Sequence, residues 1–224
     1  MGRGTGAVSP SVISAVSSGA HPSNSAAIGL LDAAGESGLT FRALAERLAT
    51  GPGAIYWHVA GKDELLGAAT DVVVAMTAGT ADTAPQDAIR ALALGAFDAI
   101  DDHPWIGAQL TRAPGQSPMM RVFEHIGRQV QALGVPAADQ FTVASALWSY
   151  ILGVAGQNAA NARSAPPDTD RAEFLGAVSA VWANLDPDEY AFTRSVAGQL
   201  RDHDDRQEFL AGIDLILTGI TAGR

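Results

Sequence analysis

The 224-residue chain is 47% hydrophobic, which is ample for a buried core and suits one large or two small domains. It contains no cysteine, which excludes disulfides, thiolate zinc sites and cysteine nucleophiles, and the cytoplasm is the predicted compartment. The formal net charge of −10 is the main observation against a nucleic-acid binder, since duplex DNA favours lysine and arginine.

The N-terminal segment, residues 1–22, is expected to form a flexible arm or a marginal extra helix. Its uncharged part, 7–20, is broken by serines and contains a proline, so it is a poor signal-peptide core. The first helix of the folded chain is predicted over 24–36, with Ser23 or Asn24 as its N-cap.

Residues 40–66 have the pattern of two short helices, joined by a tight turn and followed at once by a third helix. Apolar residues recur at helical spacing, the pattern breaks at 50–53, and it restarts on a shorter helix over 53–59. Thr40 is the predicted cap of the first of these helices. This layout is typical of a helix-turn-helix DNA reader.

The rest of the chain is predicted to be helical, because no period-2 strand pattern competes. A linking helix is predicted over 62–79, and further helices over 86–102, 104–112, 118–133, 137–163, 171–184, 188–200 and 206–222. We therefore predict an all-α fold in three parts: the arm, a helix-turn-helix domain at 23–68, and a helical effector-binding and dimerisation domain at 80–224.

Two of these helices, 137–163 and 206–222, are apolar nearly all the way round and must be covered on every side. Pairing with the same helices of a second copy in a four-helix bundle is the predicted solution, and burial within one subunit is the alternative. The candidate dimer-interface residues are Phe141, Ala144, Trp148, Gly153, Phe209, Ile213, Ile216, Leu217 and Ile220. The uncharged stretch 140–162 is long enough for a membrane span, but its polar side chains would lack partners in lipid, so no membrane contact is predicted.

The segment from Leu39 to Leu66 resembles the N-terminal domain of the tetracycline-repressor (TetR) family. The resemblance rests on the leucine-threonine start, Arg42, Leu44-Ala45, Leu48, the run from Ile55 to Val59, Lys62 and Leu65-Leu66. A looser similarity extends over about 25–222, through the segment HPWIGAQLTR that begins at His103 and the apolar run 209–217. The chain departs from the family pattern at Ala49, where glycine is more usual, and at 23–25, where the family usually has arginines.

The resemblance implies a set of DNA-binding residues in the helix-turn-helix domain at 23–68, which we call the head. Arg42 is the best candidate to read a base, because a guanidinium can grip O6 and N7 of guanine, whereas Tyr56 and Lys62 suit phosphates. Tyr56 or Trp57 serving as core, and His58 serving as a cap, are the alternatives. The full candidate set is Thr40, Arg42, Pro52, Gly53, Ala54, Tyr56, Trp57, His58 and Lys62.

An effector cavity is expected in the domain at 80–224, which we call the body, among its helices at 86–102, 104–112, 118–133 and 137–163. Its candidate lining residues are Phe97, His103, Trp105, Ile106, Leu110, Met119, Met120, Phe123, Leu147, Trp148, Ile151, Gln157 and Asn161, with plain core as the alternative for each. In the tetracycline-binding branch, a histidine at the position matched by His103 and a carboxylate from the long interface helix together hold a drug-bound magnesium ion. That carboxylate position falls here on Gln157, and a neutral amide is a poor magnesium ligand. We therefore predict an uncharged or hydrogen-bonding organic effector and no metal or cofactor.

The predicted function is a homodimeric transcriptional repressor that a small organic effector releases from a palindromic DNA operator. The runner-up is a ligand- or partner-binding dimer with little DNA affinity, which the acidic charge favours. No enzymatic activity is predicted, since 101–103 and 202–205 read as solvated helix ends, and a helical enzyme using His103 or His203 is the third alternative.

Overall fold

The structure is a computed structural model that describes residues 22–51, 61–76, 83–111, 117–164 and 170–222. Within these ranges the chain forms helices and no strand, which confirms the predicted all-α fold. The contacts divide the chain into two compact units, Met1–Gly156 and Gln157–Arg224. The first unit includes the head and the part of the body up to residue 156. The predicted domain boundary near residue 80 stays a prediction.

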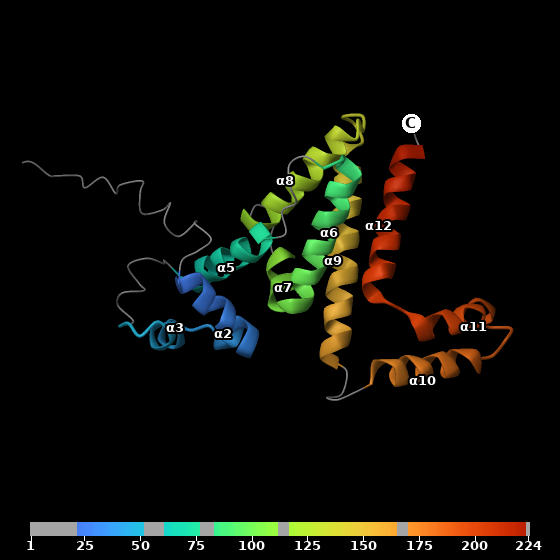
Figure 1. Cartoon of the computed structure of the whole chain (residues 1–224), viewed down its shortest axis with the longest axis horizontal. Helices are drawn as coiled ribbons and strands as arrows, with labels where there is room; N and C mark the ends of the chain where they lie inside the picture. The colour runs from blue at the N-terminus through green and yellow to red at the C-terminus, as the bar shows by residue number, and fades with distance from the viewer. Residues whose placement is uncertain (1–21, 52–60, 77–82, 112–116, 165–169, 223–224) are drawn as a thin grey trace, which may run out of the picture. The chain divides into compact units, whose positions relative to one another are not determined.

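The head of the first unit contains α2 (Pro22–Gly38), α3 (Phe41–Arg47) and α5 (Lys62–Met76). Helix α2 packs against both of the others, as Figure 1 shows in blue and teal. The side chains of Leu31, Leu44 and Leu66 are fully buried between them. The expectation of an N-cap at Ser23 or Asn24 is wrong, because α2 begins at Pro22 and both residues lie in its first turn. Proline suits that place, since its fixed φ matches the helix and its missing N–H would have had no helical partner.

Helix α3 is closed at both ends by defined caps. Thr40 is extended and its hydroxyl accepts the Ala43 amide at 3.1 Å, which confirms the predicted N-cap. At the other end the Thr50 amide donates to the Ala45 carbonyl and the Ala49 amide donates to the Glu46 carbonyl. This is the Schellman arrangement, in which the residue after the C-cap adopts the left-handed conformation. Ala49 holds that position with a φ of 50°.

Helix α2 is interrupted at Gly35, whose φ of 61° and ψ of −164° are not helical. This backbone region is open to glycine and strained for other residues. The interruption separates Asp32 from Glu36, so the two carboxylates are not placed by one continuous helix.

The body of the first unit contains α6 (Pro85–Asp102), α7 (Trp105–Leu110), α8 (Ser117–Ala132) and the start of α9 (Gln140–Ser164). Helix α6 packs against α7 and α8, and α5 packs against all three, so α5 joins the head to the body. The side chains of Ile89, Ile100, Ile106 and Ile126 are fully buried. Helix α8 ends in a second Schellman cap, in which the Val135 amide donates to the Val130 carbonyl and Gly134 has a φ of 75°.

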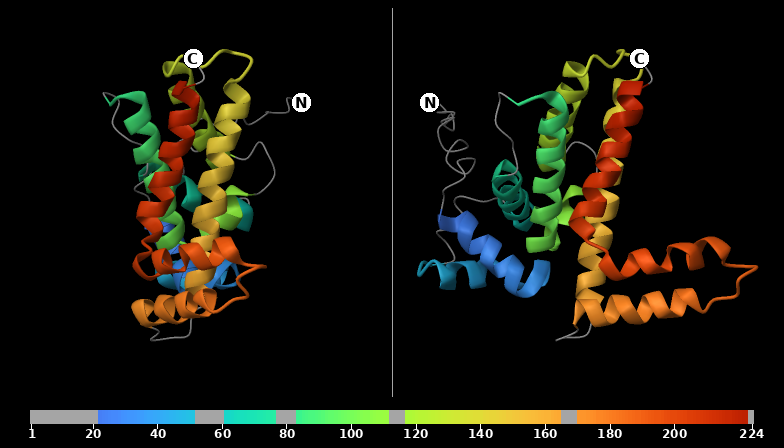
Figure 2. Two further views of the ribbon diagram at one scale, coloured as in Figure 1. Left: turned by 90° about the vertical axis from the view of Figure 1, so that its right-hand side faces the viewer. Right: turned by 45° about the vertical axis from the view of Figure 1, so that its right-hand side comes forward.

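The second unit contains the end of α9, α10 (Arg171–Ala183), α11 (Ala191–Val196), the 3-10 helix η1 (Ala197–Asp202) and α12 (Asp205–Ala222). Figure 2 shows α10 and α11 side by side as a hairpin, in orange. The buried hydroxyl of Ser179 on α10 donates to the Ala197 carbonyl at 2.7 Å, which ties α10 to the start of η1.

The single helix predicted over 188–200 is wrong. The structure has instead the short α11 followed by η1, and α11 starts three residues later than predicted. The physical reason lies at Asp186, whose carboxylate accepts the amides of Asp188 and Glu189 at 2.9 and 3.0 Å and holds a turn there.

In the part of the chain that the structure describes, no helix combines the length and the apolar character that crossing a bilayer requires.

Candidate nucleic-acid interface and its junction with the body

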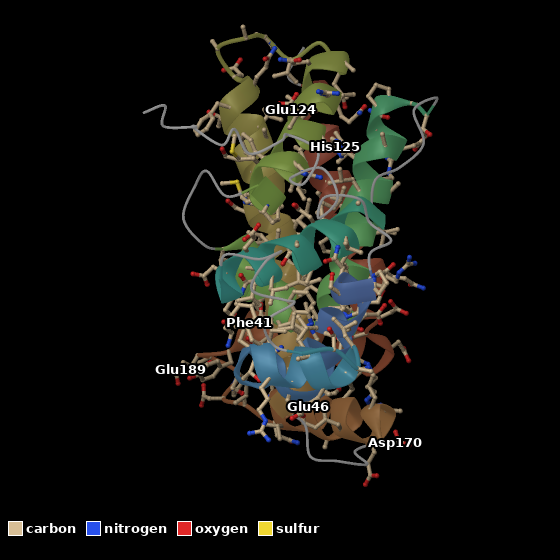
Figure 3. The ribbon with its side chains drawn as sticks, turned by 90° about the vertical axis from the view of Figure 1, so that its left-hand side faces the viewer. Phe41, Glu46, Glu124, His125, Asp170 and Glu189 are labelled. Carbon is tan, nitrogen blue, oxygen red and sulfur yellow. The ribbon has the colours of Figure 1, made fainter. Side chains whose placement is uncertain are left out.

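The surface of α3 carries the candidate base-reading residue. Arg42 lies two residues after the Thr40 cap, and 87% of its side chain is exposed. Its Nε donates to Glu46 Oε1 at 2.9 Å, one turn further along the same helix. Figure 3 looks onto the head and labels Phe41 and Glu46, both on α3. An exposed ion pair of this kind contributes well under about 1 kcal/mol, so DNA can compete for the guanidinium.

Two further cations of the head are in contact with α2. The Lys62 ammonium donates to the backbone carbonyl of Glu36, which fastens the start of α5 to the end of α2. An ammonium has three donors, so this bond leaves Lys62 able to meet a phosphate as well. The guanidinium of Arg47 lies over Gly29, where an added Cβ would come within 2.6 Å of it.

The remaining predicted DNA-binding residues lie outside the described residues. They are Pro52, Gly53, Ala54, Tyr56, Trp57 and His58. Thr40, Arg42 and Lys62 are therefore the members of the predicted set whose surroundings are known, and their contact with DNA stays a prediction.

A polar junction joins the head to α7. Asp32 Oδ1 lies 2.7 Å from His103 Nδ1 and accepts the indole N–H of Trp105 at 2.8 Å. Because a carboxylate only accepts, His103 carries its proton on Nδ1 in this contact. A second contact follows one turn along α7, where the Gln109 amide donates to the Glu36 carboxylate. Asp32, His103, Trp105, Glu36 and Gln109 together form what we call the head–body junction.

Sequence reasoning found only part of this junction. His103 and Trp105 were predicted to line an effector cavity, whereas the structure places both against a carboxylate of α2. Asp32, Glu36 and Gln109 were missed as functional residues. Asp32 and His103 are 71 residues apart in the chain, so no local pattern could have paired them.

The predicted effector-lining residues have different surroundings. Phe97, Ile106, Leu110, Leu147 and Ile151 are buried in the hydrophobic core. Met119, Phe123 and Trp148 are half-buried, whereas Met120, Gln157 and Asn161 are exposed. Gln157 and Asn161 belong to the second unit and the others to the first. Effector binding by these residues stays a prediction.

The predicted dimer-interface residues divide into buried, half-buried and exposed positions. Ala144, Phe209, Ile213 and Leu217 are buried in the single chain, and Trp148, Ile216 and Ile220 are half-buried. Gly153 is exposed, as is Phe141, whose side chain is 74% exposed and meets Phe123 edge-on at a ring distance of 6.2 Å. Leu215 on α12, which the prediction did not include, is 75% exposed.

The acidic run at 202–205 is occupied by local contacts. Asp205 lies 3.0 Å from His203 Nε2 and also pairs with Arg171 at the start of α10. Among the described residues, no group of three or more histidine, aspartate or glutamate side chains is arranged to hold a metal ion.

Comparison with protein families places the head in a known group. Residues 25–69 match the model described as bacterial regulatory proteins, tetR family. A curated helix-turn-helix transcriptional regulator of Saccharopolyspora erythraea is 32% identical over 132 residues, which is 58% of this chain and 56% of that protein. The matched region thus spans little more than half the length of that curated relative.

Solved structures extend the likeness to nearly the whole chain. A transcriptional regulator of Streptomyces coelicolor, itself a TetR, is 61% identical, with a TM-score of 0.82 over 89% of this chain and 96% of that one. BioQ of Mycobacterium smegmatis is 29% identical, with a TM-score of 0.59 over 89% of this chain and 96% of that one. ActR of Streptomyces coelicolor, solved with actinorhodin, shares the fold at 20% identity and a TM-score of 0.72, over 90% of this chain and 94% of that one. This chain belongs to the TetR family of bacterial regulatory proteins.

Proposed function

We propose that this protein is a DNA-binding transcriptional regulator, and specifically a homodimeric repressor of a palindromic operator. The observation that supports it most directly is the head, in which a Thr40-capped α3 presents an exposed Arg42 inside the region that matches the family model. BioQ, which is 29% identical to this chain, has been solved with its double-stranded DNA operator. In the proposed complex, residues 53–59 of each head enter successive major grooves, as in other helix-turn-helix dimers.

A second copy completes the proposed reader. Helices α9 and α12 expose Phe141 and Leu215, and large apolar side chains on a surface favour contact with another protein surface. A palindromic operator requires two heads related by a two-fold axis, which an isologous contact of α9 and α12 would supply.

The proposed effector is a small organic molecule bound in the body beside the half-buried Met119, Phe123 and Trp148. An effector releases the operator only if it favours the non-binding arrangement of the heads. A preference of about 3 kcal/mol would lower operator affinity by roughly two orders of magnitude. By linkage, operator DNA must lower effector affinity by the same factor.

The test begins with selection of genomic fragments by the purified protein, followed by titration of the best fragment at several salt concentrations. Arg42→Ala is compared with wild type, and Arg90→Ala is the matched control because Arg90 lies on α6 of the body and also pairs with an acid on its own helix. If Arg42 reads a base, the variant loses about tenfold or more in affinity and its preference for the operator relaxes. If Arg42 meets a phosphate, all sequences lose affinity alike and the salt slope falls by about one.

Failure to enrich any fragment with wild-type protein at low salt would reject the repressor proposal. The alternative, a ligand- or partner-binding dimer with little DNA affinity, would then take its place. The net charge of −10 is the observation that favours this alternative.

A further inference from the structure

The head–body junction is made of three polar contacts between α2 and the segment that begins at His103. One carboxylate oxygen of Asp32 serves both His103 and the buried Trp105, and the Glu36 carboxylate serves the buried Gln109. A buried indole N–H or amide that loses its acceptor costs about 1–3 kcal/mol. The junction therefore favours the arrangement in which Trp105 and Gln109 keep their acceptors.

The arrangement of the head is defined further at Glu36. Its side chain accepts from α7 while its backbone carbonyl accepts the Lys62 ammonium at the start of α5. Gly35 allows Glu36 to accept both bonds, because its φ of 61° turns the chain between Asp32 and Glu36. Helices α2, α5 and α7 are in this way fixed to one another at a single point.

His103 makes contacts that its predicted place in an effector cavity does not include. Its Nδ1 is committed to Asp32, and Trp105 shares that carboxylate. His103 lies between the end of α6 and the start of α7. Its backbone amide donates to the Ala99 carbonyl and so caps α6. A change in the body that moves either helix would therefore move the donors that hold Asp32.

We propose that Asp32 and Glu36 are positioning residues, which hold the head against α7 in the arrangement that binds operator DNA, with His103, Trp105 and Gln109 as their donors. In this proposal His103 serves as one of the donors of the head–body junction. The expected effect on operator affinity rests on the proposed function. The expected effect on the position of the head does not depend on it.

The experiment measures the position of the head directly as well as operator affinity. Since the chain has no cysteine, Ser25→Cys on α2 and Ala91→Cys on α6 create two unique sites for spin labels, both exposed. Labelled chains are diluted into an excess of unlabelled chains, so that the distance distribution reports head against body within one chain. Operator affinity and thermal melting are measured on the unlabelled proteins.

Five variants separate positioning from simple stability. Asp32→Ala removes the acceptor, Trp105→Phe removes only the indole donor, and His103→Ala removes the imidazole donor. His103→Asn is the conservative rescue, because an amide nitrogen can take the place of Nδ1. Asp87→Asn is the control, since Asp87 is a carboxylate on α6 whose ion pair with Arg90 does not reach the head.

The expected result is a wider distance distribution and an operator affinity about tenfold lower in Asp32→Ala, His103→Ala and Trp105→Phe. His103→Asn and Asp87→Asn should match wild type in both measurements. An unchanged distribution and unchanged affinity in Asp32→Ala would overturn the inference. A wild type that binds no operator would reject the proposed function alone, because the distance distribution would still test the position of the head.

Discussion

Ala49 and Gly134 occupy the same position in two helix caps of one kind. Each follows the C-cap residue of its helix, α3 or α8, and each has a positive φ, 50° for Ala49 and 75° for Gly134. In both caps the next residue donates its amide to a carbonyl five residues back. The left-handed region costs an L-residue about 1–2 kcal/mol, and glycine avoids that cost. The head therefore carries backbone strain at the C-terminal cap of α3, and the body does not carry it at the equivalent place in α8.

Ala49→Gly should relieve this strain. We expect a gain of about 0.5–1 kcal/mol in the free energy of unfolding, because the greater freedom of glycine in the unfolded chain offsets part of the relief. Urea unfolding followed by circular dichroism measures it. Gly134→Ala is the matched control and should destabilise the protein; a stabilised Gly134→Ala would show that φ is not the determining quantity.

Gly35→Ala should weaken the head although an added Cβ meets nothing within 4 Å. The reason is backbone strain of about 1–3 kcal/mol at its φ of 61° and ψ of −164°. The same substitution at Gly67, which lies in α5 and is also open, should be neutral or stabilising by up to about 1 kcal/mol. Equal melting temperatures for the two variants would contradict the assignment.

Glu46→Gln should strengthen binding to DNA of any sequence by a small factor, of the order of twofold, because it removes a negative charge beside Arg42. The free energy of unfolding should stay within about 0.5 kcal/mol of wild type, since an exposed pair contributes little. Titration of non-specific duplex at low salt measures the first effect. Glu124→Gln is the matched control, because Glu124 forms the same kind of pair with Arg128 on α8 of the body. A twofold gain in both variants would mean that only net charge matters.

Leu215 and Leu217 on α12 provide a comparison of an exposed and a buried leucine. Leu215→Ala should weaken the proposed dimer and leave the stability of the single chain unchanged, because that side chain is 75% exposed. Leu217→Ala should cost about 2–5 kcal/mol in unfolding free energy, as is usual for a buried leucine. Sedimentation velocity across a dilution series measures the first effect and denaturant unfolding the second. An undisturbed dimer in Leu215→Ala would place the contact elsewhere.

Local sequence patterns predicted most of the helices correctly, because they depend on periodicity and caps within a few residues. The Thr40 cap and the helix of 86–102, which the structure extends to Pro85, are of this kind. The predicted start of α2 and the single helix predicted over 188–200 were wrong. Pro22 and the turn at Asp186 set these ends through one or two residues, which the pattern of apolar residues does not indicate. The family resemblance, in turn, drew attention to Ala49 as a departure from the usual glycine.

The head–body junction was beyond local reasoning. Trp105 was a candidate cavity-lining residue with plain core as the alternative, and nothing near it in the sequence indicates an acceptor on α2. The sequence analysis did not single out Gln109, yet it is buried against Glu36. Contacts between segments some 70 residues apart depend on tertiary packing, which composition and spacing do not encode in readable form.

The head–body junction also bears on how such regulators can be recombined. Exchanging heads between family members is an attractive way to give an existing sensor a new operator. In this chain the head contributes the acceptors Asp32 and Glu36, and the body contributes the donors His103, Trp105 and Gln109. A chimera made at the linker alone would pair carboxylates with whatever side chains the new body offers at those three places. Transplanting the donors together with the head is therefore the construction we expect to keep its switching behaviour.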